Sequence, residues 1–249
     1  MMPLVSRVSR HVQGVQWAQL DPAVQARVPI AILDLLGCAA AGYRLGVHQA
    51  WVKTMVTSAG PPESTLWCHN NIRLPAAHAA LVNGAIAHHI EMDDGNPRAS
   101  VHGGVTVVPV ALAVGEVVRA SGEEVLTAVV AGYDAAVACG RAIVRGMTAH
   151  RLHEPSMVGC FGATATAARL LGLPADRIAA SLGLAGALMP FGPFEAFTKG
   201  APVKDLYGGW PAFIGVMAAQ LTKAGLSGSR DLFEAAADGV GSALLHAPV

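Results

Sequence analysis

SGEEVLTAVVAGYDAAVACGRAIV, residues 121–144, is the stretch that decides the fold class of this chain. Ser121 followed three residues later by Glu124 is a capping box, the sequence signature of a helix start. The apolar run that follows contains many small residues, which allow a neighbouring helix to approach closely. These small residues are Ala128, Ala131, Gly132, Ala135, Ala136, Ala138 and Gly140. The stretch therefore predicts a long helix near the centre of the molecule.

Helix start and stop signals recur on both sides of this stretch. Asp21-Pro22 is an N-cap followed by proline at the first helical position, and it predicts a helix that runs to Gly42 with a kink at Pro29. Further helices are expected at about 157–171, from a cap at Asp176 onward, and at 208–224 with Gly225 past the end.

Strand signals are almost absent. The β-branched run from Val105 to Val110 is interrupted by Pro109, and helical spacing continues to Val118, so we expect a helix there. Irregular loops are expected at 70–73 and 192–203. Because no internal repeat or linker is present, the sequence predicts a single all-α domain over residues 1–249.

Composition argues against several classes of function. The 249 residues are 53% hydrophobic and 14% charged, with 17 basic and 17 acidic residues. A net charge of zero gives no field that attracts nucleic acid. Uncharged stretches at 74–90, 178–194 and 206–222 are each broken by Gly, Pro, His or Asn, so we interpret them as core helices rather than membrane spans. Scarce charge and abundant alanine predict a surface partly hidden in an oligomer.

The termini and cysteines indicate the compartment. The N-terminus carries Arg7 and Arg10 but no apolar run with a cleavage site, so no signal peptide is expected and the cytoplasm is the predicted location. The cysteines are widely spaced in apolar surroundings, which predicts reduced thiols in the core. They are Cys38, Cys68, Cys139 and Cys160.

The densest cluster of ionisable residues is HHIEMDDGNPR, residues 88–98, with His102 shortly after it. Carboxylates after a helix C-terminus oppose the helix dipole, and this local cost is easier to understand if the group serves a site. The alternative, a solvated turn in which Asp93 and Asp94 cap the next helix, remains open.

Metal and nucleotide sites are weaker alternatives. His88, Glu91 and Asp93 could converge on a metal ion, but the spacing matches no common ligand motif. The segment 198–210 is rich in glycine and lysine, yet it matches neither of the common phosphate-binding loops. Lys204 within it could still neutralise a carboxylate.

A second candidate segment is RLHEPS, residues 151–156, just before an expected helix. The free N–H groups of a helix start favour a carboxylate ligand beside His153. The alternative is a surface loop with Ser156 as the N-cap residue.

Five stretches together closely resemble the MmgE/PrpD family, in order and over nearly the whole chain. They are ILDLLGC at 32–38, NGAIAH at 83–88, the pair Asp93-Asp94, residues 159–173 ending in LLGL, and KDLY at 204–207. The family includes 2-methylcitrate dehydratase, cis-aconitate decarboxylase and iminodisuccinate epimerase. The resemblance implies a mostly helical domain, homodimerisation, and cofactor-independent chemistry on small polycarboxylates.

The resemblance also suggests which residues form the site. The family's Asp-Phe-Asp-Asp-Thr falls on EMDDG at 91–95, which places the catalytic carboxylate at Glu91 and loses the threonine at Gly95. The downstream histidine of the family is retained as His102. We expect His102 to act as an acid or base and Glu91 to orient it or to accept protons.

The remaining family positions are only partly retained. The family's His-Pro-Thr becomes His-Glu-Pro, which keeps His153 as a second acid or base and loses a hydroxyl at Pro155. The family's lysine falls on Lys204, which we expect to hold a substrate carboxylate. Asp93 and Asp94 are expected either to contact substrate or to support the site.

Two hypotheses of function follow. Enzymes that this chain resembles continue into a smaller α/β domain, whereas this sequence stops at Val249. Either a separate chain supplies the rest, the sequence is a fragment, or this form does something other than catalysis. The first hypothesis is a hydro-lyase of the 2-methylcitrate dehydratase type, with epimerase or decarboxylase activity as variants, as one half of a split enzyme with a complementary α/β chain. The second is a noncatalytic helical binding or assembly module. The lost hydroxyls favour the module, and the retained His102, His153 and Lys204 favour the enzyme.

Overall fold

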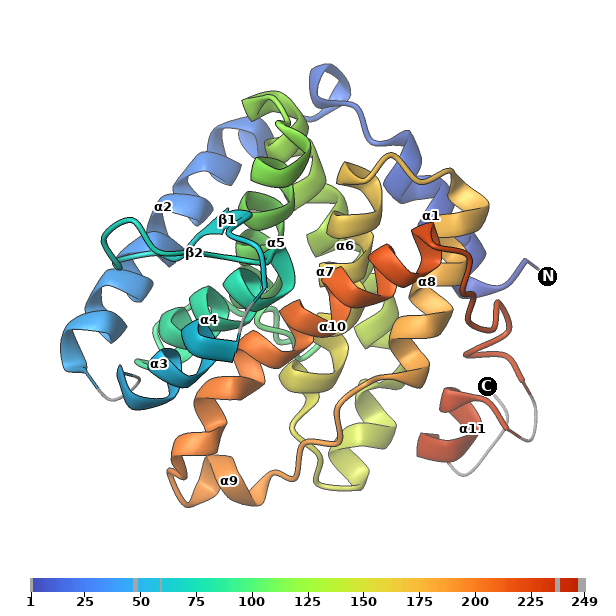
Figure 1. The fold of residues 1–249 in the computed structure, drawn as a ribbon. Helices are drawn as coiled ribbons and strands as arrows, with labels where there is room; N and C mark the ends of the chain where they lie inside the picture. The colour runs from blue at the N-terminus through green and yellow to red at the C-terminus, as the bar shows by residue number, and fades with distance from the viewer. Residues whose placement is uncertain (1, 47–48, 59, 236–237, 246–249) are drawn as a thin grey trace.

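The computed structural model describes residues 2–46, 49–58, 60–235 and 238–245, and it is an all-α fold, as predicted (Figure 1). Its α-helices are α1 (Leu4–Gly14), α2 (Pro22–Leu45), α3 (Gln49–Ser58), α4 (Ala76–His88), α5 (Gly103–Val118), α6 (Gly122–Ala149), α7 (Glu154–Leu170), α8 (Ala175–Ala187), α9 (Glu195–Thr198), α10 (Leu206–Lys223) and α11 (Val240–Leu245). Short 3-10 helices lie at η1 (Trp17–Gln19) and η2 (Pro202–Asp205). Strands β1 (Ser64–Thr65) and β2 (Arg73–Leu74) pair antiparallel. The expected domain, 1–249, also includes residues outside the described ranges, Val249 among them.

Helices α4, α5, α7 and α10 form the centre of the molecule. Helix α7 packs against α10, α6 and α5, and α4 packs against α10, α5 and α2. Every residue of α4 except His78 is buried, so this helix has no solvent-facing side. The uncharged stretches at 74–90, 178–194 and 206–222 include all of α4 and most of α8 and α10, which confirms the prediction of helices with buried residues there.

The helix predicted from residues 121–144 is α6, and its start is the expected capping box. Ser121 Oγ accepts a hydrogen bond from the Glu124 N–H at 3.3 Å, and Glu124 Oε2 accepts one from the Ser121 N–H at 2.7 Å. One side of α6 packs on α7 through small residues, where a Cβ on Gly132 would lie 2.0 Å from Thr166 Oγ1. The helix therefore approaches its neighbour as closely as its composition predicted.

Two helix ends differ from the sequence prediction. Helix α2 starts at the predicted Asp21 cap and passes through Pro29, but it ends at Leu45 rather than at Gly42. Its C-cap residue is Gly46, whose φ is 75°. Gly42 lies inside the helix, and a Cβ there would sit 2.2 Å from the carbonyl oxygen of Ile86. The glycine serves close packing of α2 on α4, not helix termination.

The start of α8 is also different. Pro174 is its N-cap residue, and Asp176 lies inside the first turn without capping it. Proline is suited to a helix start because the backbone N–H that it lacks would have no hydrogen-bond partner within the helix there. The expected loop at 192–203 contains α9 and the first residues of η2, and the segment 70–73 leads through a turn into β2.

Glycines bring α4 and α10 into backbone contact. A Cβ on Gly209 would lie 2.1 Å from the carbonyl oxygen of Leu81, and one on Gly84 would lie 3.1 Å from that of Gly208. On Gly208 it would lie 2.6 Å from the Cβ of His88. This glycine crossing therefore fixes the last residue of α4 beside the first turn of α10.

Two described helices, α2 and α6, are long and apolar enough to cross a membrane by length and composition. The apolar segment of α6 is 61% buried inside the molecule, as expected for a core helix, whereas that of α2 is only 22% buried. All four cysteines are free, and three are buried as predicted. Cys68 is exposed, so the prediction of a core position was wrong for it.

Candidate active site

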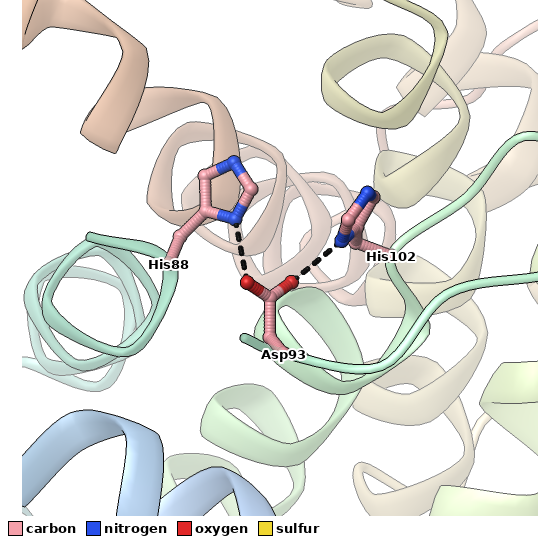
Figure 2. A group of neighbouring side chains, drawn as sticks. All are labelled: His88, Asp93 and His102. Carbon is pink, nitrogen blue, oxygen red and sulfur yellow. Dashed lines mark hydrogen bonds and ion pairs between the residues drawn. The ribbon is translucent and has the colours of Figure 1, made fainter. Parts of the chain in front are cut away.

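Asp93 lies between two imidazoles in the loop that joins α4 to α5. Its Oδ1 is 3.0 Å from His88 Nδ1 and its Oδ2 is 2.7 Å from His102 Nδ1 (Figure 2). The Asp93 side chain has no exposed surface. Since a carboxylate only accepts hydrogen bonds, each ring donates through Nδ1, and its Nε2 points away from Asp93. The carboxylate thus sets the orientation of both rings.

The hydrogen bonds also set the charges of this group. Burial alone would raise the pKa of Asp93, but the hydrogen bonds from His102 and His88 outweigh burial and lower this pKa to about 2. The hydrogen bond to Asp93 raises the pKa of His102 above its ordinary value, against the effect of desolvation. At neutral pH, Asp93 is therefore a carboxylate that favours the protonated form of His102.

Glu91 and Lys204 extend the group toward α10. Lys204 is buried in η2, and its Nζ donates to Oε1 of Glu91. The same carboxylate oxygen lies 3.3 Å from Nε2 of His88. A continuous series of contacts thus links Lys204, Glu91, His88, Asp93 and His102. We call these five residues the ionisable cluster.

The backbone at Glu91 is unusual. Its φ is 53°, in the left-handed region that non-glycine residues seldom adopt. Such a conformation persists where surrounding contacts hold it, and the contacts to Lys204 and His88 do so here.

His153 is a buried imidazole at the N-cap position of α7. Its side chain packs against the rings of Tyr207 and Phe197, with centroids 4.6 and 5.9 Å away, and its Nδ1 is buried without a hydrogen-bond partner among the described residues. Desolvation, followed by the charges of His88 and His102, lowers the pKa of His153 to about 4. The ring is therefore neutral at pH 7. Position Ser156, the alternative cap, lies inside the helix.

Asp94 links the start of α5 to the middle of α6. Its Oδ1 accepts from the Gly104 N–H at 2.7 Å, and its Oδ2 accepts from the Tyr133 hydroxyl at 2.6 Å. Each carboxylate oxygen of Asp93 and Asp94 thus accepts a hydrogen bond from another residue of the protein. Of the two roles that the sequence left open for them, these contacts favour support of the site over contact with substrate.

Sequence reasoning missed several members of the site. His88 was noticed but given no acid–base role, and Tyr133 was not considered because it lies on another helix, 39 residues from Asp94. Asp205 was also missed, although it directly follows Lys204. Its Oδ2 lies 2.8 Å from His89 Nδ1, which ties η2 to the end of α4.

Two cavities open beside the ionisable cluster. The larger, of about 410 Å³, is lined by Glu91, Lys204 and residues of α9 and η2. The smaller, of about 250 Å³, is lined by His102 together with Gly95 and Pro155. Of the expected site residues, Glu91 and Lys204 therefore line one cavity and His102 lines the other. Asp93, Asp94 and His153 are not among the lining residues of either one.

A third cavity, of about 680 Å³, is larger than either of these and lies elsewhere, between the end of α1 and the ends of α5 and α7. Its Arg169 is already occupied, because the guanidinium donates to backbone carbonyls of Val15 at 2.6 Å and Gln13 at 3.1 Å. None of the expected acid–base residues lines this cavity.

The residues that could hold a metal ion differ from the expected trio. Ligand atoms of His88, Asp93 and His102 lie within 4.8 Å of one another, whereas the sequence pointed to Glu91 as the third ligand. The Asp93 oxygens already pair with both Nδ1 atoms at hydrogen-bond distance.

A helical domain that collects imidazoles, carboxylates and an ammonium group at the ends of its central helices has the groups that proton transfer beside an anionic ligand requires. The chain belongs to the MmgE/PrpD family, because the family's N-terminal domain matches residues 6–248.

Curated relatives are similar over most of the chain. Cis-aconitate decarboxylase of Homo sapiens is 29% identical over 231 residues, which are 90% of this chain and 47% of the human protein. The enzyme of the same name from Mus musculus is 28% identical over 237 residues, and cis-aconitate decarboxylase-like protein oryM of Aspergillus oryzae is 25% identical over 222 residues. The chain spans about half the length of these relatives.

Proposed function

We propose that this chain is the helical part of a lyase that transfers a proton at a carbon beside a carboxylate of a small polycarboxylate. The observation that carries the proposal is the ionisable cluster, which joins a lysine in one cavity to an imidazole in the next. His102, oriented by Asp93, exchanges the proton through Nε2. Lys204 holds a carboxylate of the substrate in place of Glu91.

The names of the relatives support decarboxylation of cis-aconitate as the first variant to test, ahead of the dehydration that the sequence favoured. Loss of carbon dioxide breaks a carbon–carbon bond and leaves the electron pair on the substrate carbon. A general acid must then donate a proton to that carbon. His102 suits this step because its hydrogen bond to Asp93 raises its pKa and favours the imidazolium.

Neutral His153 is the second acid–base candidate. Its pKa of about 4 makes it a proton acceptor rather than a donor at pH 7. Two imidazoles whose pKa values are shifted in opposite directions give the site an acid and a base at one pH. This division of roles also serves the dehydratase and epimerase variants.

We further propose that a complementary α/β chain covers this end of the molecule. Large apolar side chains near the site are exposed: Met92, Phe191, Phe197 and Val203. Exposed apolar patches of this kind mark surfaces that a partner covers. A cover would also exclude water, which strengthens the charge interactions that stabilise a carbanion.

Specific observations favour the alternative, a noncatalytic binding or assembly module. Gly95 and Pro155, where the family resemblance led us to expect hydroxyl residues, both line the His102 cavity. Lys204 is also paired internally with Glu91, so a ligand carboxylate must displace an existing partner.

The test is an assay of carbon dioxide release from cis-aconitate, with citrate, methylcitrate and iminodisuccinate assayed for the variant reactions. We expect slow turnover by the chain alone and faster turnover with the α/β domain of a relative added as a separate polypeptide, with loss of activity in His102→Gln. The matched control is His11→Gln, whose ring pairs with Asp134 at the exposed surface.

Three outcomes separate the hypotheses. Turnover by the chain alone at ordinary enzyme rates, about 1 to 10³ s⁻¹, would show that no second chain is needed. Binding of citrate without turnover under any condition would favour the module. Addition of the α/β domain should also raise the melting temperature, because a partner that binds only the folded state stabilises it.

A further inference from the structure

A second pair of ionisable side chains, His89 and Asp205, lines the cavity of about 410 Å³ that Glu91 and Lys204 also line. His89 Nδ1 lies 2.8 Å from Oδ2 of Asp205. Lys204 and Asp205 are consecutive residues of η2, and their partners Glu91 and His89 are two positions apart, just after α4. The Lys204–Glu91 pair and the His89–Asp205 pair therefore lie side by side on one cavity.

The hydrogen bond to Asp205 determines which nitrogen of His89 is available to a ligand. Since a carboxylate only accepts hydrogen bonds, the ring donates to it through Nδ1. The other nitrogen, Nε2, makes no hydrogen bond to any described residue. His89 thus lines the cavity with one nitrogen occupied and one without a partner.

The two pairs differ in how easily their carboxylates can move. The Glu91 side chain is 36% exposed, so it can turn toward solvent and leave Lys204 Nζ to a ligand. The Asp205 side chain is only 8% exposed and has no such route, so His89 keeps this partner. The cavity therefore has two places for a ligand carboxylate, one at Lys204 and one at His89.

A protonated imidazole can bridge two carboxylates, because both of its nitrogens then carry a hydrogen that they can donate. Histidine exchanges this proton near neutral pH. With Asp205 at Nδ1 and a ligand carboxylate at Nε2, both donors of the His89 ring make charge-assisted hydrogen bonds. Phe197 and Pro202 line the same cavity and provide apolar surface for the carbon skeleton of the ligand.

We propose that His89 makes this cavity selective for ligands with two carboxylates: His89 Nε2 binds one of them and Lys204 Nζ binds the other. This inference rests on the proposed function, in which Lys204 holds a substrate carboxylate. It adds a specificity-determining residue to that site and narrows the substrate class to compounds whose two carboxylates fit one cavity. His102, on the neighbouring cavity, is left free to transfer the proton.

The test compares glutarate with butyrate, which is glutarate with one carboxylate replaced by hydrogen. NMR titration of the whole chain gives both dissociation constants. We expect the wild type to bind glutarate about tenfold or more tightly than butyrate, the value of one more hydrogen bond between charged groups. His89→Asn should reduce this preference to about twofold or less, because the second carboxylate then has no second partner.

Asparagine separates ligand binding from structure at this position. Its amide nitrogen can replace Nδ1 as the donor to Asp205, whereas no atom replaces Nε2. Circular dichroism confirms that the variant is folded. The matched control is Lys199→Gln, which removes an exposed positive charge beside the cavity and changes none of its lining residues. This control should keep the wild-type preference, which would show that contact rather than the overall field of the site causes it.

A measurement on the wild type tests the contact without any variant. The ¹⁵N resonance of His89 Nε2 should shift as glutarate is added, because this nitrogen gains a hydrogen-bond partner.

Three results would overturn the inference. The first is a wild type that binds glutarate not at all, or no more than about twofold more tightly than butyrate. The second is a folded His89→Asn variant that keeps the wild-type preference. The third is a His89 Nε2 resonance that does not move when glutarate is saturating.

Failure of the proposed function gives a different result. A chain that prefers glutarate through His89 but releases no carbon dioxide from cis-aconitate under any condition would refute the proposed reaction and leave this inference standing. Turnover of cis-aconitate by a chain whose preference for glutarate does not depend on His89 would refute this inference alone.

Discussion

The Nδ1 atom of His102 lies 2.7 Å from Oδ2 of Asp93, and this hydrogen bond is made to a carboxylate with no exposed surface. Asp93 holds His88 in the same way through its other oxygen. One buried carboxylate thus orients two imidazoles that the chain separates by 14 residues, His88 at the end of α4 and His102 at the start of α5. The orientation of both rings and the raised pKa of His102 therefore depend on this single side chain.

Asp93→Asn should lower the pKa of His102, because the hydrogen bond to Asp93 is the main cause that raises it. An amide offers only one acceptor oxygen, so one imidazole loses its partner, and we expect a loss of about 1–3 kcal/mol in the free energy of unfolding. NMR titration of the histidine ring protons and urea denaturation measure the two effects. Asp134→Asn is the control at an exposed His–Asp pair. An unchanged His102 titration would contradict the prediction.

His153→Phe should remove a pH dependence of stability. The pKa of His153 is about 4 in the folded chain against 6.5 for the free side chain. Between these values the unfolded state binds a proton that the folded state does not, so the wild type loses stability as the pH falls from 6.5 to 4. The loss amounts to roughly 3 kcal/mol and ends below pH 4.

The measurement is urea denaturation of both proteins from pH 4 to 8. The difference in unfolding free energy between wild type and His153→Phe should be constant above pH 6.5 and should change as the pH is lowered. A constant difference over the whole range would show that His153 titrates normally.

Lys204→Ala should weaken binding of citrate or cis-aconitate by about 1.5–3 kcal/mol, the value of a hydrogen bond to a charged group. The cause is loss of the ammonium group from the cavity that Glu91 also lines. Isothermal titration calorimetry gives the affinity. Lys223→Ala, at the exposed end of α10, should bind as the wild type does. Equal affinities for the two variants would refute the assignment of Lys204 as the carboxylate-binding residue.

Gly95→Thr should fit the site and increase turnover of cis-aconitate. A Cβ on Gly95 would make ordinary contacts, 3.9 Å from His102 Cε1 and from the Val101 carbonyl oxygen, so we expect a stability change within about 1 kcal/mol. The new hydroxyl would lie beside the imidazole that transfers the proton. Gly95→Val has the same shape without the hydroxyl and is the control. If both variants have the same turnover, the hydroxyl has no role in the reaction.

The sequence predicted local features well, because their causes are local. The capping box at Ser121 lies within four residues of chain and appears as expected. The prediction at Gly42 was wrong for a different reason: a glycine can end a helix or allow close packing, and only the neighbouring Ile86 shows which of the two applies.

The site was predictable in its residue types but not in its contacts. Glu91, His102, His153 and Lys204 were chosen from the resemblance to the family and from their rarity in an apolar chain. The sequence could not show that Lys204 is held by Glu91, since 113 residues separate them. For the same reason it could not show that the cavity at His102 is distinct from the one at Lys204.

The glycine crossing of α4 and α10 gives the spacing of the site an unusual origin. In most sites, side-chain packing sets the distance between two helices, and packing can adjust when a neighbouring side chain changes its rotamer. At Gly84, Gly208 and Gly209 there is no rotamer to change, because main chain touches main chain or the first side-chain carbon. The separation of His88 from the start of α10 is therefore insensitive to sequence drift elsewhere in the core, and the apolar residues around it are free to diverge while the site geometry is preserved.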